Sequence, residues 1–355
     1  MDIEERVKAV LNGQMPDVIP MLIYSNHLPR GKFERYLRNL GLGLDVRCSV
    51  YRAYMPNVRI EERRVGNHLY TVYYTPQGNL SMVTRVNLKF QLAGGSWIVE
   101  YPVKNVNDVK ALKFMIEDTV YEAYYDEYSQ LKDDLEGDGV VTVSSDYTPL
   151  MKIIVRYMGF KNFALIYKRR QNVIDDIIQA IDEKYVEMYK IIANSPAEIV
   201  RIGDNIDSTF ISPALFEKYC LPYYNKYSRI LRARGKKVIS HMDGRLKILK
   251  DLIAKAELDA IEAFTPPPVG DLPIKEAKEA WGNKVIWINF PETIFLDGPE
   301  RIKSFTINLL EEAAPGDRLI IGITEDVPPE YLKVGLKSLV ETIHEYGRLP
   351  IKLPS

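Results

Sequence analysis

The residues of this sequence best suited to chemistry follow short β-branched runs in its C-terminal half. His241 closes the run Lys236–His241 and begins a His-x-Asp triplet with Asp243, and Glu325 follows the run Arg318–Thr324. Alternate residues of a strand point to the same side, so His241 and Asp243 should share one face. One imidazole nitrogen and two carboxylate oxygens would leave zinc the open position that catalytic sites need. A hydrogen-bonded histidine beside solvated acids is the alternative, because His-x-Asp triplets are common.

Polar residues also lie at or after four further β-branched runs. They are Tyr147 after the third run, Asp204 and Asn205 at the fourth, Glu262 in the sixth and Asn289 at the seventh. If the runs are parallel strands of a barrel, their C-terminal ends meet at one mouth, where active sites of such barrels lie. The sequence therefore predicts that these groups converge with the His-x-Asp triplet.

The β-branched runs alternate with longer stretches of helical spacing. The runs are Val18–Tyr24, Asp45–Tyr51, Gly139–Ser145, Glu198–Asp204, Lys236–His241, Leu258–Ala263, Lys284–Asn289 and Arg318–Thr324. Strands that alternate with helices indicate βα units on a parallel sheet. Eight of them predict an α/β protein with a TIM (β/α)8 barrel, with Asp2–Leu11 as a helix across its floor. A doubly wound open sheet is the alternative, although no glycine-rich phosphate loop follows any run.

Helix signals support this order in the C-terminal half. The predicted helices are Pro213–Gly235, Leu246–Ala256, Leu272–Trp281, Pro299–Ala314 and Glu330–Gly347. Ser212 precedes Pro213, which gives a capping residue followed by proline at the first helical position. Gly235 stands where a helix end needs a residue that tolerates positive φ.

An insertion at about residues 52–138 separates the second and third predicted strands. Residues 57–103 alternate apolar and polar positions between turn signals such as Gly66-Asn67, which predicts antiparallel hairpins. Helices should follow over Asp108–Glu117 and Val120–Leu135. The second would carry a stripe of tyrosines, which favours core packing over a substrate-facing wall: Tyr121, Tyr124, Tyr125 and Tyr128. We expect one domain over residues 1–355, a barrel with this β-hairpin and helical insertion.

Composition excludes several classes of protein. The 355 residues include 47 basic and 48 acidic ones, so a net charge of −1 argues against nucleic-acid binding as the main role. Two cysteines, Cys48 and Cys220, cannot build a disulfide framework or a four-cysteine zinc site. The acidic start is unlike a secretory signal, and no apolar run is long enough for a membrane span. We expect a cytoplasmic protein without a membrane partner.

Three blocks of the sequence resemble uroporphyrinogen decarboxylase-like proteins. They are the opening from Glu5 to Pro20, the block from Gly203 to Pro222, and Lys236–Gly244. The similarity extends over about Glu5 to Gly347 and implies a TIM barrel. It also implies one of two chemistries, which are decarboxylation of a porphyrinogen without cofactor and zinc-dependent methyl transfer involving a corrinoid.

The two branches differ in motifs that this chain can be compared with. Decarboxylases carry an arginine-rich segment after strand one, which Pro29–Phe33 only loosely resembles, and an acid after strand two, where Cys48–Tyr54 has none. The methyltransferases bind zinc through His-x-Cys at a strand end and a distant cysteine. Here His241 matches, whereas Asp243 and Glu325 stand at the cysteine positions. Carboxylates are harder ligands than thiolates and leave zinc a stronger Lewis acid, which suits polarisation of an ether oxygen.

The resemblance therefore implies a methyltransferase component of an O-demethylase. Zinc on His241, Asp243 and Glu325 would bind the oxygen of a small aryl methyl ether, and the Co(I) corrinoid (cobalamin) of a partner corrinoid protein would accept the methyl group. Glu262, Asp204 and Asn205 would orient ligands or substrate, and Tyr147 and Asn289 would contact substrate. Simple alternatives are that Asp204 caps a helix, that Glu262 pairs with a lysine and that Tyr147 is an ordinary core residue.

Other functions remain open for the same residues. They are cofactor-free decarboxylation of a tetrapyrrole, methyl transfer between a methylcobamide and a thiol, zinc-dependent hydrolysis, and ligand binding by an inactive barrel. Metal analysis separates the zinc-dependent functions from the others. The sequence does not fix the substrate, the direction of transfer or the oligomeric state, for which a homodimer is one possibility.

Overall fold

The core of the protein is a closed barrel of eight parallel strands. The computed structural model describes residues 1–88 and 95–352. In barrel order the strands are β1 (Met21–Tyr24), β14 (Leu319–Ile323), β13 (Val285–Asn289), β12 (Ala260–Phe264), β11 (Lys237–His241), β10 (Ile199–Gly203), β9 (Gly139–Ser144) and β2 (Leu42–Cys48), which pairs with β1. Each predicted run contributes one of them, so the predicted TIM barrel is confirmed and the open sheet is wrong. Closure brings all eight C-terminal strand ends to one mouth.

The floor of the barrel is filled by the first helix, α1 (Ile3–Leu11). Its apolar face, including Val7 and Val10, forms one buried cluster with inward residues from seven strands, among them Leu22 and Trp287. Asp2 caps the helix by accepting a hydrogen bond from the backbone N–H of Glu5 at 2.7 Å. The predicted helix across the floor is therefore confirmed, and the reactive end of the barrel is the opposite one.

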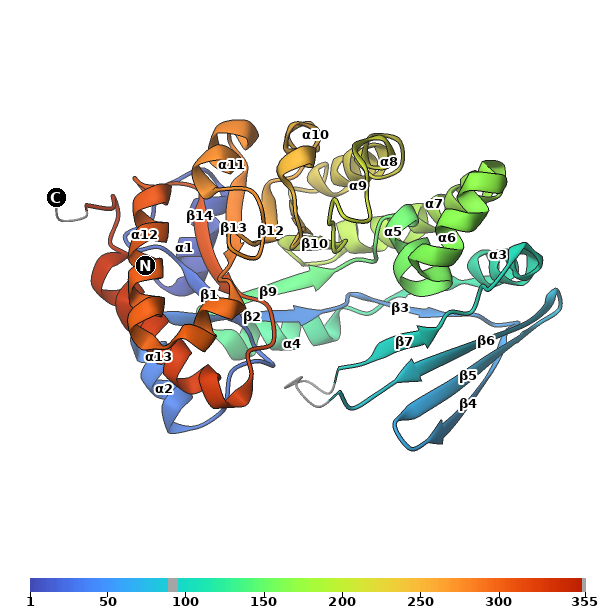
Figure 1. Cartoon of the computed structure of the whole chain (residues 1–355), viewed down its shortest axis with the longest axis horizontal. Helices are drawn as coiled ribbons and strands as arrows, with labels where there is room; N and C mark the ends of the chain where they lie inside the picture. The colour runs from blue at the N-terminus through green and yellow to red at the C-terminus, as the bar shows by residue number, and fades with distance from the viewer. Residues whose placement is uncertain (89–94, 353–355) are drawn as a thin grey trace.

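The remaining helices lie outside the barrel and in its insertion (Figure 1). They include α2 (Lys32–Asn39), α3 (Val109–Asp118), α4 (Asp126–Leu135), α6 (Gly159–Arg169), α7 (Gln171–Asn194), α9 (Leu221–Arg232), α12 (Pro299–Ala313) and α13 (Pro329–Tyr346). Short ones are α5 (Pro149–Lys152), α8 (Pro213–Tyr219), α10 (Lys250–Ala254), α11 (Ile274–Trp281), 3-10 turns at Val106–Asp108, Lys247–Leu249 and Glu292–Asp297, and a π-helical turn at Ile153–Met158. None of the helices in the described part of the chain is long and apolar enough to cross a membrane.

The predicted helices of the C-terminal half are confirmed with two changes. Ser212 does cap α8, because its hydroxyl accepts a hydrogen bond from the N–H of Leu215 at 3.3 Å. The single helix predicted over 213–235 is divided at Cys220, after which a second helix, α9, begins at Leu221 with Pro222 in its first turn. The helix predicted over 246–256 is reduced to a 3-10 turn followed by the five residues of α10.

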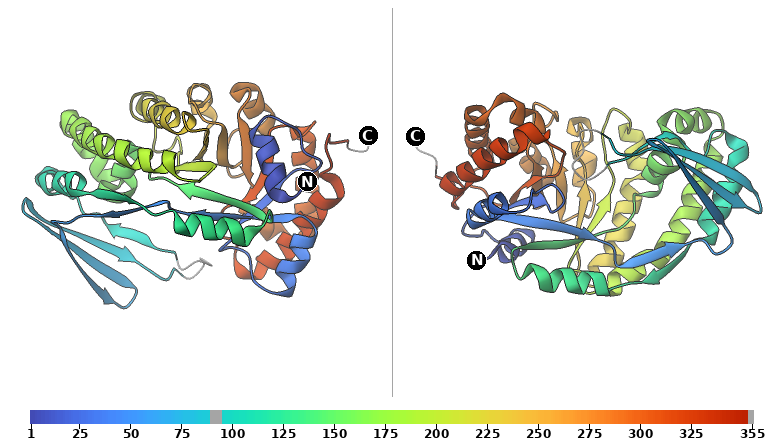
Figure 2. Two further views of the ribbon diagram at one scale, coloured as in Figure 1. Left: turned by 180° about the vertical axis from the view of Figure 1, so that it is seen from behind. Right: turned by 90° about the horizontal axis from the view of Figure 1, so that it is seen from below.

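The insertion between β2 and β9 forms an arm that extends away from the barrel (Figures 1 and 2). Its antiparallel sheet contains β4 (Arg59–Val65), β5 (His68–Thr75), β6 (Gly78–Arg85) and β7 (Trp97–Glu100), as the turn signals predict. A separate two-stranded sheet pairs β3 (Tyr51–Tyr54) with β8 (Val120–Ala123). The arm therefore has its own scaffold beside the barrel mouth.

The helix predicted over Val120–Leu135 is wrong in its first part. Val120–Ala123 is the strand β8, and the helix α4 begins only at Asp126. Pairing with β3 overrides the helical spacing, which is the usual way that tertiary contacts defeat local propensity. The tyrosine stripe consequently does not exist as one helix face. Tyr121 packs edge-on against Tyr51, with ring centroids 5.6 Å apart, whereas Tyr128 is buried in the core.

A glycine in β2 provides a direct test of the packed floor. A Cβ at Gly43 would lie 2.3 Å from Cγ2 of Ile3 and 2.8 Å from Cδ2 of Leu22. We predict that Gly43→Ala lowers the free energy of unfolding by about 1–3 kcal/mol, because α1 must move outward. Gly203→Ala is the matched control, since a Cβ there meets nothing within 4 Å. Urea denaturation measures both, and equal effects of the two substitutions would contradict this packing of α1.

Candidate metal centre

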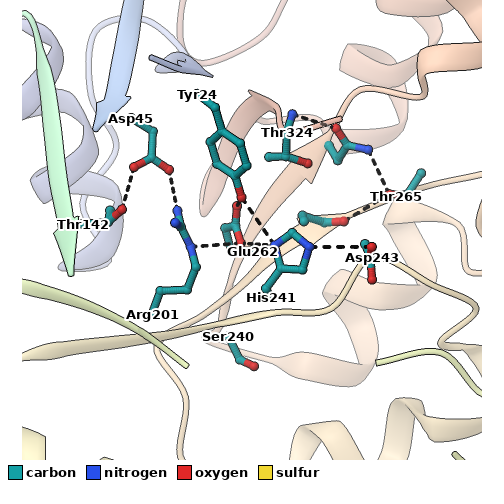
Figure 3. A network of polar contacts seen from close by, with 12 residues as sticks. Tyr24, Asp45, Thr142, Arg201, Ser240, His241, Asp243, Glu262, Thr265 and Thr324 are labelled. Carbon is teal, nitrogen blue, oxygen red and sulfur yellow. Dashed lines mark hydrogen bonds and ion pairs between the residues drawn. The ribbon is translucent and has the colours of Figure 1, made fainter. Parts of the chain in front are cut away.

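Three possible metal ligands meet at the barrel mouth. His241 is the last residue of β11, Asp243 comes two residues after it, and Glu325 comes two residues after the end of β14. One ligand atom from each residue lies within 4.8 Å of the other two. Nε2 of His241 is 3.6 Å from Oδ2 of Asp243 (Figure 3). His241, Asp243 and Glu325, which the sequence predicts to meet at the mouth, are therefore neighbours in space.

The second ring nitrogen of His241 is held by a buried carboxylate. Nδ1 lies 2.8 Å from Oε2 of Glu262, which is directly opposite His241 in the β11–β12 register. Glu262 is fully buried, and its other oxygen accepts a hydrogen bond from the hydroxyl of Tyr24 at 2.7 Å. The Glu262 contact fixes the orientation of the imidazole and leaves Nε2 directed toward Asp243.

A chain of alternating charges extends from Glu262 to the far side of the barrel. Nε of Arg201 lies 3.1 Å from Oε2 of Glu262, out of line for a hydrogen bond but close enough for an ion pair. The same guanidinium donates to Asp45, which also accepts a hydrogen bond from the hydroxyl of Thr142 at 2.6 Å. The arginine thus bridges two buried carboxylates that belong to β2 and β12 (Figure 3). Buried charges of this kind persist only when they are paired.

These charges shift the pKa values of the site in opposite directions. Burial alone would raise the pKa of Glu262, but Arg201 and His241 outweigh it and lower that pKa to about 2. Burial would likewise lower the pKa of His241, but Glu262 and Asp243 raise it to about 10. Burial, reinforced by Asp243, raises the pKa of Glu325 to about 7. Negative charge is thus concentrated around one imidazole at the mouth. A bound cation would reduce the repulsion between these carboxylates.

Local backbone features position two of the strand ends. Residue Ala263 of β12 has φ +59°, and the register with β13 shifts across it, so a bulge directly follows Glu262. Bulges of this kind re-aim side chains next to active sites. Asn289 is buried and bridges the loops, donating to Thr265 at 3.2 Å and accepting from the N–H of Thr324 at 3.0 Å. The amide of Asn289 therefore holds the residue before Glu325.

A polar cavity of about 450 Å³ lies beside this centre. Its walls come from the ends of β1, β2 and β9 and include Ser25, Asn26, Arg47 and Ser144. The guanidinium of Arg47 covers the ring of Tyr24 at 3.8 Å, and the Tyr24 hydroxyl reaches Glu262. Tyr24 is therefore the physical link between the cavity and the candidate ligands.

The other residues predicted for the site lie in different surroundings. Asp204 is fully buried and accepts hydrogen bonds from the N–H and hydroxyl of Thr148 and from the hydroxyl of Tyr224, each at 2.6 Å. Burial raises the pKa of Asp204 to about 7. Asn205 is exposed, and Tyr147 is half-buried with the Arg156 guanidinium 5.4 Å from its ring centre. Asp204 therefore ties helices to the barrel. Of the three residues predicted to orient ligands or substrate, which are Glu262, Asp204 and Asn205, Glu262 is the one that contacts His241 directly.

The sequence prediction missed Tyr24, Asp45 and Arg201. A signal was present for Arg201, which stands inside an otherwise apolar strand, and for Asp45, which follows three apolar residues of β2, because a charge in such a place needs a buried partner. His27 was also missed, and its Nε2 lies 3.6 Å from Oδ1 of Asp326, next to Glu325. The partner of each charge could not be assigned from sequence, since the pairs are formed across the barrel.

The chain belongs to the uroporphyrinogen decarboxylase family. The sequence model of that family, described as "Uroporphyrinogen decarboxylase (URO-D)", matches residues 82–346, which is more than half of the chain. The barrel also includes β1 and β2, which precede the matched segment. No curated protein sequence matches the chain significantly.

Two solved structures align with this chain at low sequence identity. A methyltransferase from Methanosarcina mazei aligns with a TM-score of 0.60 and 13% identity, covering 98% of this chain and 99% of that one. A putative vitamin-B12-independent methionine synthase from Listeria monocytogenes aligns with a TM-score of 0.37 and 12% identity, over 62% and 68% of the two chains. The first likeness extends over the whole fold, insertion included, and the second has no bearing on function.

The charge chain generates a prediction about stability. Arg201→Met would leave two buried carboxylates without their shared cation, so we expect the free energy of unfolding to fall by about 3–5 kcal/mol. Adding Asp45→Asn should recover part of that loss, because one of the two unpaired charges is removed. Arg229→Met, which breaks an exposed arginine pair with Glu257, is the matched control and should cost about 1 kcal/mol or less. Urea unfolding followed by circular dichroism measures all three, and a loss for Arg201→Met as small as the control's would contradict the bridge.

Proposed function

We propose that this chain is a zinc-dependent methyltransferase that transfers the methyl group of an aryl methyl ether to the Co(I) corrinoid of a partner protein. The observation that carries the proposal is the convergence of His241, Asp243 and Glu325 at the barrel mouth. A histidine and two acids from separate strand ends form an open three-ligand set, the arrangement of a catalytic rather than a structural zinc site.

The geometry of the three residues fits zinc. Bonds of roughly 2.0–2.2 Å at tetrahedral angles place neighbouring ligand atoms about 3.4 Å apart. The separation of 3.6 Å between Nε2 of His241 and Oδ2 of Asp243 is close to that value. Glu325 reaches the same group within 4.8 Å, so a small rotation of its side chain would complete the set. The contact from Nδ1 of His241 to Glu262 is the carboxylate–histidine arrangement that commonly supports zinc ligands.

The chain's own residues would perform four tasks. Glu262 holds His241 in one orientation, and Arg201 keeps Glu262 ionised. Asp243 and Glu325 supply oxygen donors, which give less electron density to the ion than thiolates do. A zinc ion bound there would supply Lewis acidity toward an ether oxygen, so that the aryl group leaves as a phenolate. The polar cavity at the same mouth, whose Arg47 lies over the ring of Tyr24, would receive the substrate.

The whole-chain likeness to a methyltransferase barrel supports the methyl-transfer branch of the family. The segment after β2 supports it as well, because residues 48–54 contain no acid for a decarboxylase to use. Carboxylates stand at the two positions where thiol-using relatives carry cysteine. Such hard ligands favour a substrate whose methyl group is bound to oxygen over a thiol substrate. Decarboxylation, thiol methylation and zinc-dependent hydrolysis are the alternative activities that the assay below must exclude.

An anaerobic methyl-transfer assay tests the function. Zinc-loaded protein should methylate a Co(I) corrinoid protein with at least one donor from a panel of methoxylated aromatics, followed by the visible spectrum of the corrinoid. His241→Ala should lose nearly all zinc and activity, because His241 supplies the single nitrogen of the candidate ligand group found among the described residues. His344→Ala is the matched control, since His344 is exposed and its ring nitrogen bonds to the backbone carbonyl of Leu40.

Other outcomes of the assay identify the alternatives. Full activity of His241→Ala would exclude the zinc site. Decarboxylation of a porphyrinogen by metal-free protein would assign the chain to the cofactor-free chemistry. Methyl transfer only when a thiol is present would assign a thiol, instead of an aryl methyl ether, as the substrate. Zinc binding without any methyl transfer would favour hydrolysis.

A ligand exchange tests why carboxylates stand in these positions. We predict that the double variant Asp243→Cys with Glu325→Cys still binds zinc, because thiolates are good zinc ligands. Its rate with an aryl methyl ether should fall by about a hundredfold, which corresponds to roughly 3 kcal/mol of lost transition-state stabilisation. Equal rates for the wild type and the double variant, with zinc content confirmed, would show that ligand hardness does not determine the substrate class.

A further inference from the structure

A second cavity lies where the arm meets the outside of the barrel, away from the metal centre. Its volume is about 300 Å³, within the usual range for small-molecule sites. Its walls are rich in tyrosine and include Tyr51, Tyr121, Tyr157 and Tyr185. None of the candidate metal ligands or their partners in the charge chain lines it. The cavity is therefore a distinct feature that the proposed function does not use.

An adjoining cavity of about 310 Å³ continues this space beneath the arm's sheet. The two share Tyr73, Met115, Lys152 and Tyr157 as common walls, so they meet around these four residues. Arg156 lines only the second cavity. Together they form a single elongated site, aromatic at one end and cationic at the other.

One buried polar group in the aromatic end has no protein partner. Tyr185 is only 2% exposed, and its hydroxyl has no hydrogen-bond partner among the described residues. A buried hydroxyl without a partner carries a free-energy penalty of about 1–3 kcal/mol, which a ligand could relieve. The tyrosine therefore marks the aromatic end as a place where a polar ligand atom is accommodated.

The segment that forms the shared wall is a π-helical turn. Ile153–Met158 adopts this rare form directly after α5, and it carries both Arg156 and Tyr157. Short π-helical turns are uncommon and are found frequently at functional sites, because the wider turn shifts side chains out of the regular helical positions. Here the π-helical turn places the guanidinium of Arg156 and the ring of Tyr157 in the wall of the same elongated site.

The charges along the site favour an anionic ligand. Lys152 forms an ion pair with Asp146, and Lys184 pairs with Glu187 at 3.3 Å, so these two lysines are largely compensated. Arg156 forms no ion pair with any carboxylate of the described residues and instead lies over the ring of Tyr147 at 5.4 Å. One uncompensated guanidinium is thus available at the cationic end, where it would bind a carboxylate with two parallel hydrogen bonds.

We propose that this elongated site binds a single-ring aromatic carboxylate, with the ring among Tyr51, Tyr121, Tyr157 and Tyr185 and the carboxylate on Arg156. The tyrosine rings offer faces and edges for offset or edge-on contact with a flat ring. A ring hydroxyl or similar group would reach the hydroxyl of Tyr185. The site is separate from the metal centre, so this proposal does not depend on whether the chain binds zinc.

Calorimetric titration of the full, metal-free chain with 4-hydroxybenzoate tests this site. The probe carries the ring, the carboxylate and a hydroxyl, but it has no methyl group to donate. We expect one binding site, with affinity weakened about tenfold by Arg156→Gln. Tyr185→Phe should weaken binding severalfold without lowering the thermal midpoint, because none of the described residues bonds to the hydroxyl that it removes.

Three controls distinguish binding at this site from binding elsewhere on the chain. Arg301→Gln removes a surface arginine that likewise lies over an aromatic ring, Phe305 at 5.9 Å, and should leave the affinity unchanged. His241→Ala should also leave it unchanged, whereas the neutral 4-hydroxybenzamide should bind about tenfold more weakly. Absence of binding, equal affinity for acid and amide, or loss on His241→Ala but not on Arg156→Gln would overturn the proposal. The last result would place the probe at the barrel mouth instead.

Discussion

The buried ion pair between Arg201 and Glu262 is the interaction on which the reactive end of this protein depends. A fully buried carboxylate is tolerated only beside a positive charge, and the guanidinium provides it at 3.1 Å while also pairing with Asp45. This arrangement connects β2, β10 and β12 across the barrel interior. Because Glu262 also contacts Nδ1 of His241, the same ion pair determines how the imidazole presents its other nitrogen at the mouth.

That orientation gives the proposed chemistry its physical basis. With Nδ1 occupied, only Nε2 of His241 can bind an ion, and it faces the carboxylate of Asp243. Asn289 anchors the backbone before Glu325, so the third candidate ligand also stands on a fixed support. Two oxygen donors in place of thiolates would make a bound ion more electron-poor, which suits a leaving aryl oxygen. The described residues of the arm supply none of the candidate ligands, and they line the tyrosine-rich cavity beside the barrel instead.

The sequence predicted the barrel well because its strands are buried on both faces and read as continuous β-branched runs. It failed at Val120–Ala123, where helical tyrosine spacing is outweighed by pairing with a strand about 70 residues earlier, an influence that local spacing does not contain. For the site, strand ends were sufficient to predict the meeting of His241, Asp243 and Glu325. They were not sufficient for Tyr24, Asp45 and Arg201, whose roles depend on which inward-facing side chains meet across a closed barrel. Asp204 shows the converse, because its place at a strand end suggested the mouth while its hydrogen bonds connect it to Thr148 and Tyr224.

X-ray absorption at the zinc edge of the zinc-loaded protein is the most direct test of this account. We expect a first shell of nitrogen and oxygen at about 2.0–2.2 Å, with outer-shell scattering from one imidazole and no sulfur. The imidazole contribution should disappear in His241→Ala. A shell containing sulfur at about 2.3 Å, or one of oxygen alone with no imidazole signal in the wild type, would contradict the assignment of His241, Asp243 and Glu325 as the metal centre.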